Sequence, residues 1–211
     1  MLDLTRTITP DMPVYPGTRP PALIDACALE REGFRETELR MFSHTGTHMD
    51  SPAHLFADGK TLDQFPADSF YGPALAVDVS AVKGRIQPED LLPHQQALQV
   101  VQFLILYTGW EHFWGQQEYF QGFPVLSPAA ARWLTQFNLK AVGVDAISVD
   151  PVEAASPLFI HKIFLGQEIL LIENLCNIQP LIGRNFTLCC LPLKTRRADG
   201  APARAVAIER V

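Results

Sequence analysis

The chain has 211 residues, of which 47% are hydrophobic and 19% charged, a balance typical of one globular domain rather than a disordered chain. Its net charge of -6 gives no basic footprint for nucleic acid, and no apolar run reaches the ~18 residues that a membrane span needs. The N-terminus shows no basic segment followed by an apolar one, and the four cysteines form no C-x-x-C pair. We therefore expect a cytoplasmic protein with reduced thiols, and neither nucleic acid nor membrane as a partner.

The first 21 residues begin with a strand candidate at Leu2 to Thr5 and continue as a proline-rich, irregular segment. Tyr15 lies in this segment between Pro13 and Pro16. Two interpretations of Tyr15 are open: a braced aromatic wall of a substrate pocket, and a tyrosine packed on the domain surface.

Residues 22–43 have the pattern of an antiparallel hairpin. Residues that favour strands fill Ala22 to Ile24 and Thr37 to Ser43, and Glu32-Gly33 supplies the turn. We expect the second strand to run directly into His44.

Residues 43–54 form the densest polar cluster of the chain. They contain three of its six histidines and a carboxylate: His44, His48, Asp50 and His54. Neutral imidazoles and a carboxylate are ligands that Zn²⁺ or Mn²⁺ prefers. The spacing of four between the first two histidines would fit a helix, but Gly46, its β-branched neighbours and Pro52 disfavour one. We predict a strand end and a tight loop that bring His44, His48 and Asp50 together, with a hydrogen-bonded polar network or plain surface histidines as competing interpretations.

Strands outnumber helices in the rest of the chain. Apolar strands are expected at residues 74–79, 99–107, 141–145, 168–174, 186–193 and 203–208. Helices are expected to begin at Pro88 and at Ser127-Pro128, and a short one to cover residues 157–166. Without a linker or repeat, the sequence predicts one compact, β-rich α/β domain over residues 1–211, with a mixed sheet.

Two further residues are candidates for the same site. Glu173 closes the apolar run Ile169 to Ile172, where a carboxylate needs a metal, an arginine or backbone amides as its partner. His161 precedes it by twelve residues. His94 and His112 have no such neighbours, and we expect them to be structural or solvated.

The string from His44 to His54 resembles the H-x-G-T-H-x-D-x-P-x-H signature of the cyclase/kynurenine formamidase family of metal-dependent hydrolases. The resemblance covers nearly the whole chain, including residues 13–17, 143–151, 173–175 and 191–194. It implies a compact domain of the swivelling β/β/α type, assembled as a homodimer or a larger homo-oligomer.

The resemblance also implies roles for individual residues. His44, His48 and Asp50 would bind a first ion, and Asp50, His161 and Glu173 a second, with Zn or Mn as the metal and one or two ions per subunit. His54 would transfer protons. Tyr15 occupies a place in the substrate pocket where kynurenine formamidases typically have tryptophan.

Metal chemistry fits these roles, because bound cations lower the pKa of water to about 7 and polarise a carbonyl, so that no serine or cysteine nucleophile is required. The leading hypothesis is hydrolysis of an amide-type C–N bond by metal-bound hydroxide, most specifically in a small molecule such as N-formylkynurenine. The alternative is opening of a cyclic amide such as isatin, or of a lactone or ester. A binding protein with a structural metal is disfavoured, because structural zinc sites usually consist of cysteine and histidine.

Overall fold

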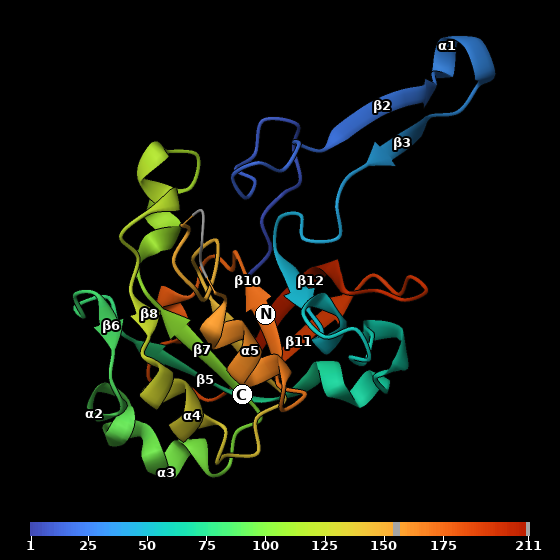
Figure 1. Cartoon of the computed structure of the whole chain (residues 1–211). Coiled ribbons are helices and arrows are strands. Elements are labelled where there is room, and N and C mark those ends of the chain that lie inside the picture. The colour runs from blue at the N-terminus through green and yellow to red at the C-terminus, as the bar shows by residue number, and fades with distance from the viewer. Residues whose placement is uncertain (154–156, 210–211) are drawn as a thin grey trace.

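Eight strands of the described residues assemble into one mixed sheet that closes on itself, and β2–β3 and β6–β8 form two separate two-stranded sheets (Figure 1). A computed structural model describes residues 1–153 and 157–209. Its strands are β1 Leu2–Asp3, β2 Ala22–Cys27, β3 Glu36–Arg40, β4 His48–Asp50, β5 Tyr71–Asp78, β6 Arg85–Ile86, β7 Phe103–Tyr107, β8 Val125–Leu126, β9 Ala141–Val144, β10 Leu170–Glu173, β11 Phe186–Pro192 and β12 Gly200–Glu209. Its α-helices are α1 Leu29–Glu32, α2 Pro88–Leu91, α3 Gln95–Leu98, α4 Pro128–Leu134 and α5 Phe159–Leu165.

Seven strands form the ring, in the order β12–β11–β5–β7–β9–β10–β4, and β4 pairs back onto β12. The strands β5, β7, β9 and β10 run parallel, while the pairs on either side of β4 are antiparallel. β1 adds to the free part of β12. The expected β-rich α/β class with a mixed sheet is confirmed, but the sheet is a closed barrel, which removes the exposed edges of an open sheet.

Alternate residues along the central strands of the barrel face two separate apolar cores. On β7, Phe103 and Ile105 point into the barrel, whereas Leu104 and Leu106 point outward. The outward side chains are covered by helices, among them α4 and α5 (Figure 1). α4 begins as expected, with Ser127 Oγ accepting from the backbone N–H of Ala130. None of the helices in the described ranges combines the length and hydropathy of a membrane-spanning helix.

The predicted hairpin is confirmed, and it stands away from the barrel as an arm made of β2, α1 and β3 (Figure 1). Every residue of β3 is exposed. The second strand ends at Arg40 and does not run into His44, so that prediction is wrong. Residues 41–47 form an irregular link that brings the chain from the arm back to the barrel.

Candidate metal centre

A three-residue strand carries two of the candidate ligands. His48 and Asp50 lie at the ends of β4 rather than in a loop, which corrects the expectation from sequence. Because side chains two residues apart on a strand share a face, both point outward from the barrel, while Met49 between them is buried inside it. Glu173 of β10 lies directly opposite His48 in the antiparallel register, which places its carboxylate on the same face.

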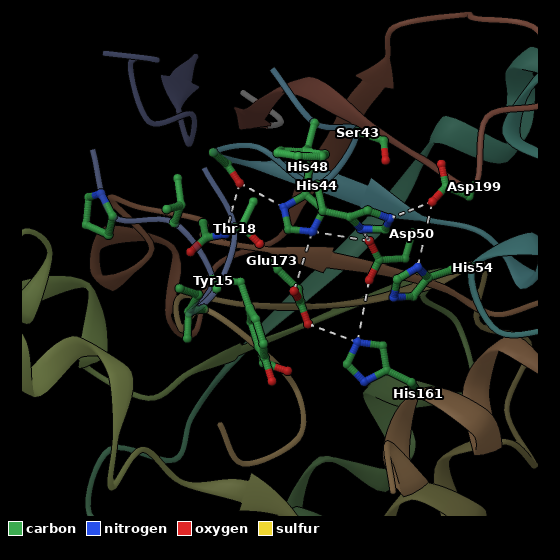
Figure 2. Close-up of a pocket in the computed structure, with 18 of the residues that line it drawn as sticks. Tyr15, Thr18, Ser43, His44, His48, Asp50, His54, His161, Glu173 and Asp199 are labelled. Atoms are coloured by element: carbon green, nitrogen blue, oxygen red, sulfur yellow. Dashed lines mark hydrogen bonds and ion pairs between the residues drawn. The ribbon is translucent and has the colours of Figure 1, made fainter. Parts of the chain in front are cut away.

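The turn before β4 adds His44. Gly46 has a φ of 66°, the left-handed conformation that glycine adopts readily, as its place in the sequence led us to expect. The turn directs the carbonyl of Gly46 toward His48, whose Nδ1 lies 2.8 Å from that oxygen. His44 Nδ1 lies 2.6 Å from Asp50 Oδ1, so His44, His48 and Asp50 converge as expected (Figure 2).

His161 reaches the same point from helix α5. Its Nε2 lies 3.6 Å from Asp50 Oδ2 and 3.4 Å from Glu173 Oε1. Its other ring nitrogen, Nδ1, lies 2.7 Å from Asp150 Oδ2, and Asp150 also accepts the backbone N–H groups of Ile160 and His161. Asp150 therefore fixes both the start of the helix and the orientation of the ring.

Two groups of three ligands share Asp50: one with His44 and His48, the other with His161 and Glu173. Asp50 Oδ2 is buried and has no hydrogen-bond partner within the described ranges. An orphaned carboxylate oxygen is costly to bury, and a divalent cation between it and the facing histidines would satisfy it. The residues present therefore fit Zn²⁺ or Mn²⁺.

The charges of the site are strongly coupled. Burial lowers the pKa of His44, but Asp50 and Asp199 outweigh it and raise that pKa to about 10. Burial likewise opposes charge on His161, while Asp150 and Glu173 raise its pKa to about 10. Burial raises the pKa of Asp50, yet His44 and His48 bring it well below its usual value. Without a cation, protons on His44 and His161 offset part of the carboxylate charge.

His54 lies at the end of a 3₁₀ turn, Pro52–His54, beside the two ligand groups. Its ring centroid is 4.1 Å from that of His44 and 6.0 Å from that of His161. Burial lowers the pKa of His54, and the neighbouring histidines lower it further. His54 is therefore the histidine of the site whose surroundings favour the neutral form.

All the predicted site residues line one cavity of about 520 Å³ (Figure 2). Tyr15 forms part of its wall together with Val14, Phe42 and Ile147, and remains 37% exposed. The pocket interpretation of Tyr15 is therefore the one that the geometry supports. His112 lies outside this lining and contacts the hydroxyl of Tyr107 instead.

Three residues around the ligands escaped the sequence reasoning as site members: Asp150, Asn174 and Asp199. Asn174 Nδ2 donates a hydrogen bond to the Gly46 carbonyl, the same oxygen that His48 Nδ1 contacts. Asp199 contacts His44 Nε2 at 3.1 Å. Asp150 and Asn174 fall in or beside segments of the family resemblance, which is a signal that could have found them. Nothing in the sequence around Asp199 marks it.

A family model described as "Putative cyclase" matches residues 2–151. The chain belongs to the cyclase family. The kynurenine formamidase of Salinibacter ruber is 32% identical over 98% of this chain and 96% of its own length. Cyclase-like protein 2 of Oryza sativa is 32% identical over 99% of this chain and 79% of that protein.

Solved structures of the family share the fold. Isatin hydrolase A from Labrenzia aggregata has a TM-score of 0.88 over 99% of this chain and 93% of its own, at 24% identity. A potential metal-dependent hydrolase with cyclase activity has a TM-score of 0.80 at 26% identity, over 99% of this chain and 97% of its own. Together with the buried ligand groups, these relatives identify the chain as a cyclase-family metal-dependent hydrolase, while identities near 30% leave its substrate open.

Proposed function

We propose that this protein hydrolyses an amide-type C–N bond, most specifically the formamide of an N-formyl aromatic amine such as N-formylkynurenine. The observation that carries the proposal is the bare Asp50 Oδ2, buried at the meeting point of two ligand groups. The kynurenine formamidases among the relatives, which align over nearly the whole chain, support the choice of substrate.

The chain's own residues divide the work. His44, His48 and Asp50 would hold one Zn²⁺ or Mn²⁺, and Asp50, His161 and Glu173 a second. A bound divalent ion supplies two effects here, since it lowers the pKa of water to about 7 and polarises a carbonyl oxygen. Because metal binding needs deprotonated ligands, the protons that His44 and His161 carry in the metal-free protein leave when the ions bind.

His54 is the proposed proton-transfer residue. Its lowered pKa keeps the ring neutral near pH 7, so Nε2 can accept a proton from the attacking water and return it to the leaving amine. Figure 2 shows its ring beside Asp50 and His161, close to both ligand groups but apart from their contacts. A base in that place lies outside the two ligand groups that share Asp50.

The pocket wall favours an aromatic substrate. Tyr15, Phe42 and Ile147 contribute apolar side chains to the lining of the cavity that holds the ligands. Tyr15 takes the place of the tryptophan that is typical of kynurenine formamidases, which leaves a smaller aromatic surface. This difference counts against N-formylkynurenine itself and leaves a second candidate function, the opening of a cyclic amide such as isatin. Isatin is the substrate for which two proteins with the same fold are named.

A substrate panel tests the proposal. The purified protein, loaded with Zn²⁺ or Mn²⁺, is incubated with N-formylkynurenine, isatin and a simple aryl lactone, and kcat/KM is measured for each. We expect the highest value for N-formylkynurenine and loss of turnover after chelation. A preference for isatin would transfer the assignment to the cyclic amide, and no turnover of any of the three would remove the proposal.

A further inference from the structure

Asp199 occupies a fixed place between two histidines of the site (Figure 2). Its Oδ2 lies 3.1 Å from His44 Nε2 and 3.8 Å from His54 Nδ1. Its backbone carbonyl accepts both the N–H and the Oγ–H of Ser51, at 2.9 and 3.0 Å. Since Ser51 directly follows Asp50, these bonds tie Asp199 to the end of the ligand-bearing strand.

The next residue, Gly200, shows that the ring of His44 is closely seated. A Cβ atom built on Gly200 would lie 2.5 Å from His44 Cε1 and 2.8 Å from Nε2, which is closer than atoms can pack. Only a glycine allows the imidazole to lie against the backbone here. Asp199 and Gly200 together form a seat for His44 at the start of β12.

In each of the three candidate ligand histidines, the ring nitrogen that faces away from the proposed cation site lies beside an oxygen acceptor. His161 Nδ1 faces the Asp150 carboxylate, His48 Nδ1 faces the Gly46 carbonyl, and His44 Nε2 faces Asp199. An acceptor at the outer nitrogen selects the tautomer that presents a lone pair inward. Asp199 differs from the other two acceptors because it also lies beside His54.

We propose that Asp199 is a positioning residue for both His44 and His54. It holds the N–H at His44 Nε2, which leaves Nδ1 free to face the cation shared with His48 and Asp50. The same carboxylate faces His54 Nδ1 and thereby keeps that ring turned toward the pocket. This inference rests on the proposed function for the role of His54, but not for the seat of His44.

The first test measures metal binding and needs no substrate. The variants are Asp199→Asn and Asp199→Ala, with Asp58→Asn as the control, because Asp58 is an exposed carboxylate that lines no part of the pocket. Affinity for Zn²⁺ is measured by competition with a chelator, and the number of ions per chain at saturation by elemental analysis. We expect both Asp199 variants to bind Zn²⁺ about 10- to 100-fold more weakly, Ala more so than Asn, with unchanged stoichiometry.

Two results of this test would overturn the proposal. One is an affinity within two-fold of the Asp58→Asn control. The other is the loss of one whole ion per chain, because His44, His54 and Asp199 form a third group close enough to hold a cation, and Asp199 would then be a ligand itself. Thermal unfolding of each variant identifies any that fails to fold, and Gly200→Ala, which displaces the same ring of His44, gives an independent measure of the seat.

The second test addresses His54. At saturating metal, the turnover of Asp199→Asn is compared with that of the wild type on the best substrate of the panel. We expect kcat to fall about 10-fold or more with KM little changed, because a misplaced base slows proton transfer rather than binding. An unchanged kcat would remove the second half of the proposal. If the wild type turns over no substrate, the proposed function fails, whereas the metal affinities still judge the seat of His44.

Discussion

Three histidines of the site, His44, His54 and His161, differ in their tendency to carry a proton. His44 and His161 face carboxylates on both ring nitrogens, which raises the pKa of each to about 10. His54 faces one carboxylate more distantly, Asp199 at 3.8 Å from Nδ1, and burial lowers its pKa. Placement alone thus separates residues suited to hold a cation from one suited to exchange protons at neutral pH.

Replacing His54 by alanine tests this separation. We expect kcat to fall by about 10²-fold or more, since general acid–base catalysis contributes about that much, while the metal content stays at the wild-type level. Steady-state kinetics and elemental analysis of the same preparation provide the measurement. His94→Ala is the matched control, because His94 lies outside the cavity lining. Unchanged turnover in His54→Ala would contradict the proton-transfer role.

Asp150 offers a second test at this scale. Asp150→Asn keeps the shape of the side chain but removes the charge that holds His161 Nδ1 at 2.7 Å. We expect metal affinity to fall about 10- to 100-fold, measured by chelator competition. The exposed Asp68, changed to asparagine, serves as the control. Affinity equal to that of the control would show that α5 positions His161 without help from this carboxylate.

The candidate ligands are predicted from the sequence, whereas the residues that orient them are not, for a physical reason. His44, His48 and Asp50 are neighbours in the chain, and their residue types alone indicate a cation. Asp199 is 155 residues from His44, and only the folded structure brings them within 3.1 Å. The Ser127 cap depends on neighbouring residues only, so it too can be predicted from the sequence. A strand of three residues such as β4 is too short to show the alternation that predicts strands.

Among the elements of the described structure, the arm of β2, α1 and β3 leaves its side chains largely exposed to solvent. Leu23 and Leu39 are cross-strand partners on it and are 39% and 56% exposed, and Phe34 near the tip is 52% exposed. A two-stranded hairpin is only marginally stable alone, so a second copy of the chain is a suitable partner for its apolar side chains. We therefore propose a homodimer or a larger homo-oligomer.

The oligomer is tested by Leu39→Glu, which places a charge on the apolar side of the arm. We expect its molar mass in light scattering to fall to that of the monomer, because an unpaired charge is costly to bury in an interface. Val100→Glu is the control, since Val100 is 73% exposed and lies away from the arm. A monomeric wild type, or a Leu39→Glu oligomer of unchanged mass, would contradict the expectation.

For the whole molecule, metal and protons compete for the same imidazoles. In the metal-free protein, the raised pKa values of His44 and His161 stabilise the fold fully below pH 6.5, and this contribution is lost as the pH rises toward about 10. Asp50 and Asp150 have lowered pKa values, so their contribution is present above pH 3.8 and is lost only as the pH falls below it.

Thermal unfolding across pH tests this competition. We expect the melting temperature of the metal-stripped protein to decrease between pH 6.5 and 10. The added stability of the metal-loaded protein should increase over the same range, because fewer protons have to be displaced. Scanning calorimetry of stripped and loaded samples in matched buffers measures both. A difference between the two samples that does not vary with pH would contradict the competition.

The sequence pattern predicts most strands of the barrel but not that the barrel closes. The strands β5, β7, β9 and β10 are apolar runs that the sequence indicates clearly, and they form one continuous parallel wall. The pairs that join β4 to β10 and β12 connect parts of the chain more than 100 residues apart, from Asp50 to Leu171 and Gly200. Their register depends on tertiary packing rather than on local alternation.

Because β4 pairs with β10 on one edge and with β12 on the other, it is the strand that closes the barrel. β4 is synthesised early, but both strands that pair with it are synthesised late. A nascent chain therefore cannot close the barrel until residues 200–202 have left the ribosome. A chain that stops short of them would still carry all five candidate ligands, but it would lack the β4–β12 pairing that closes the ring.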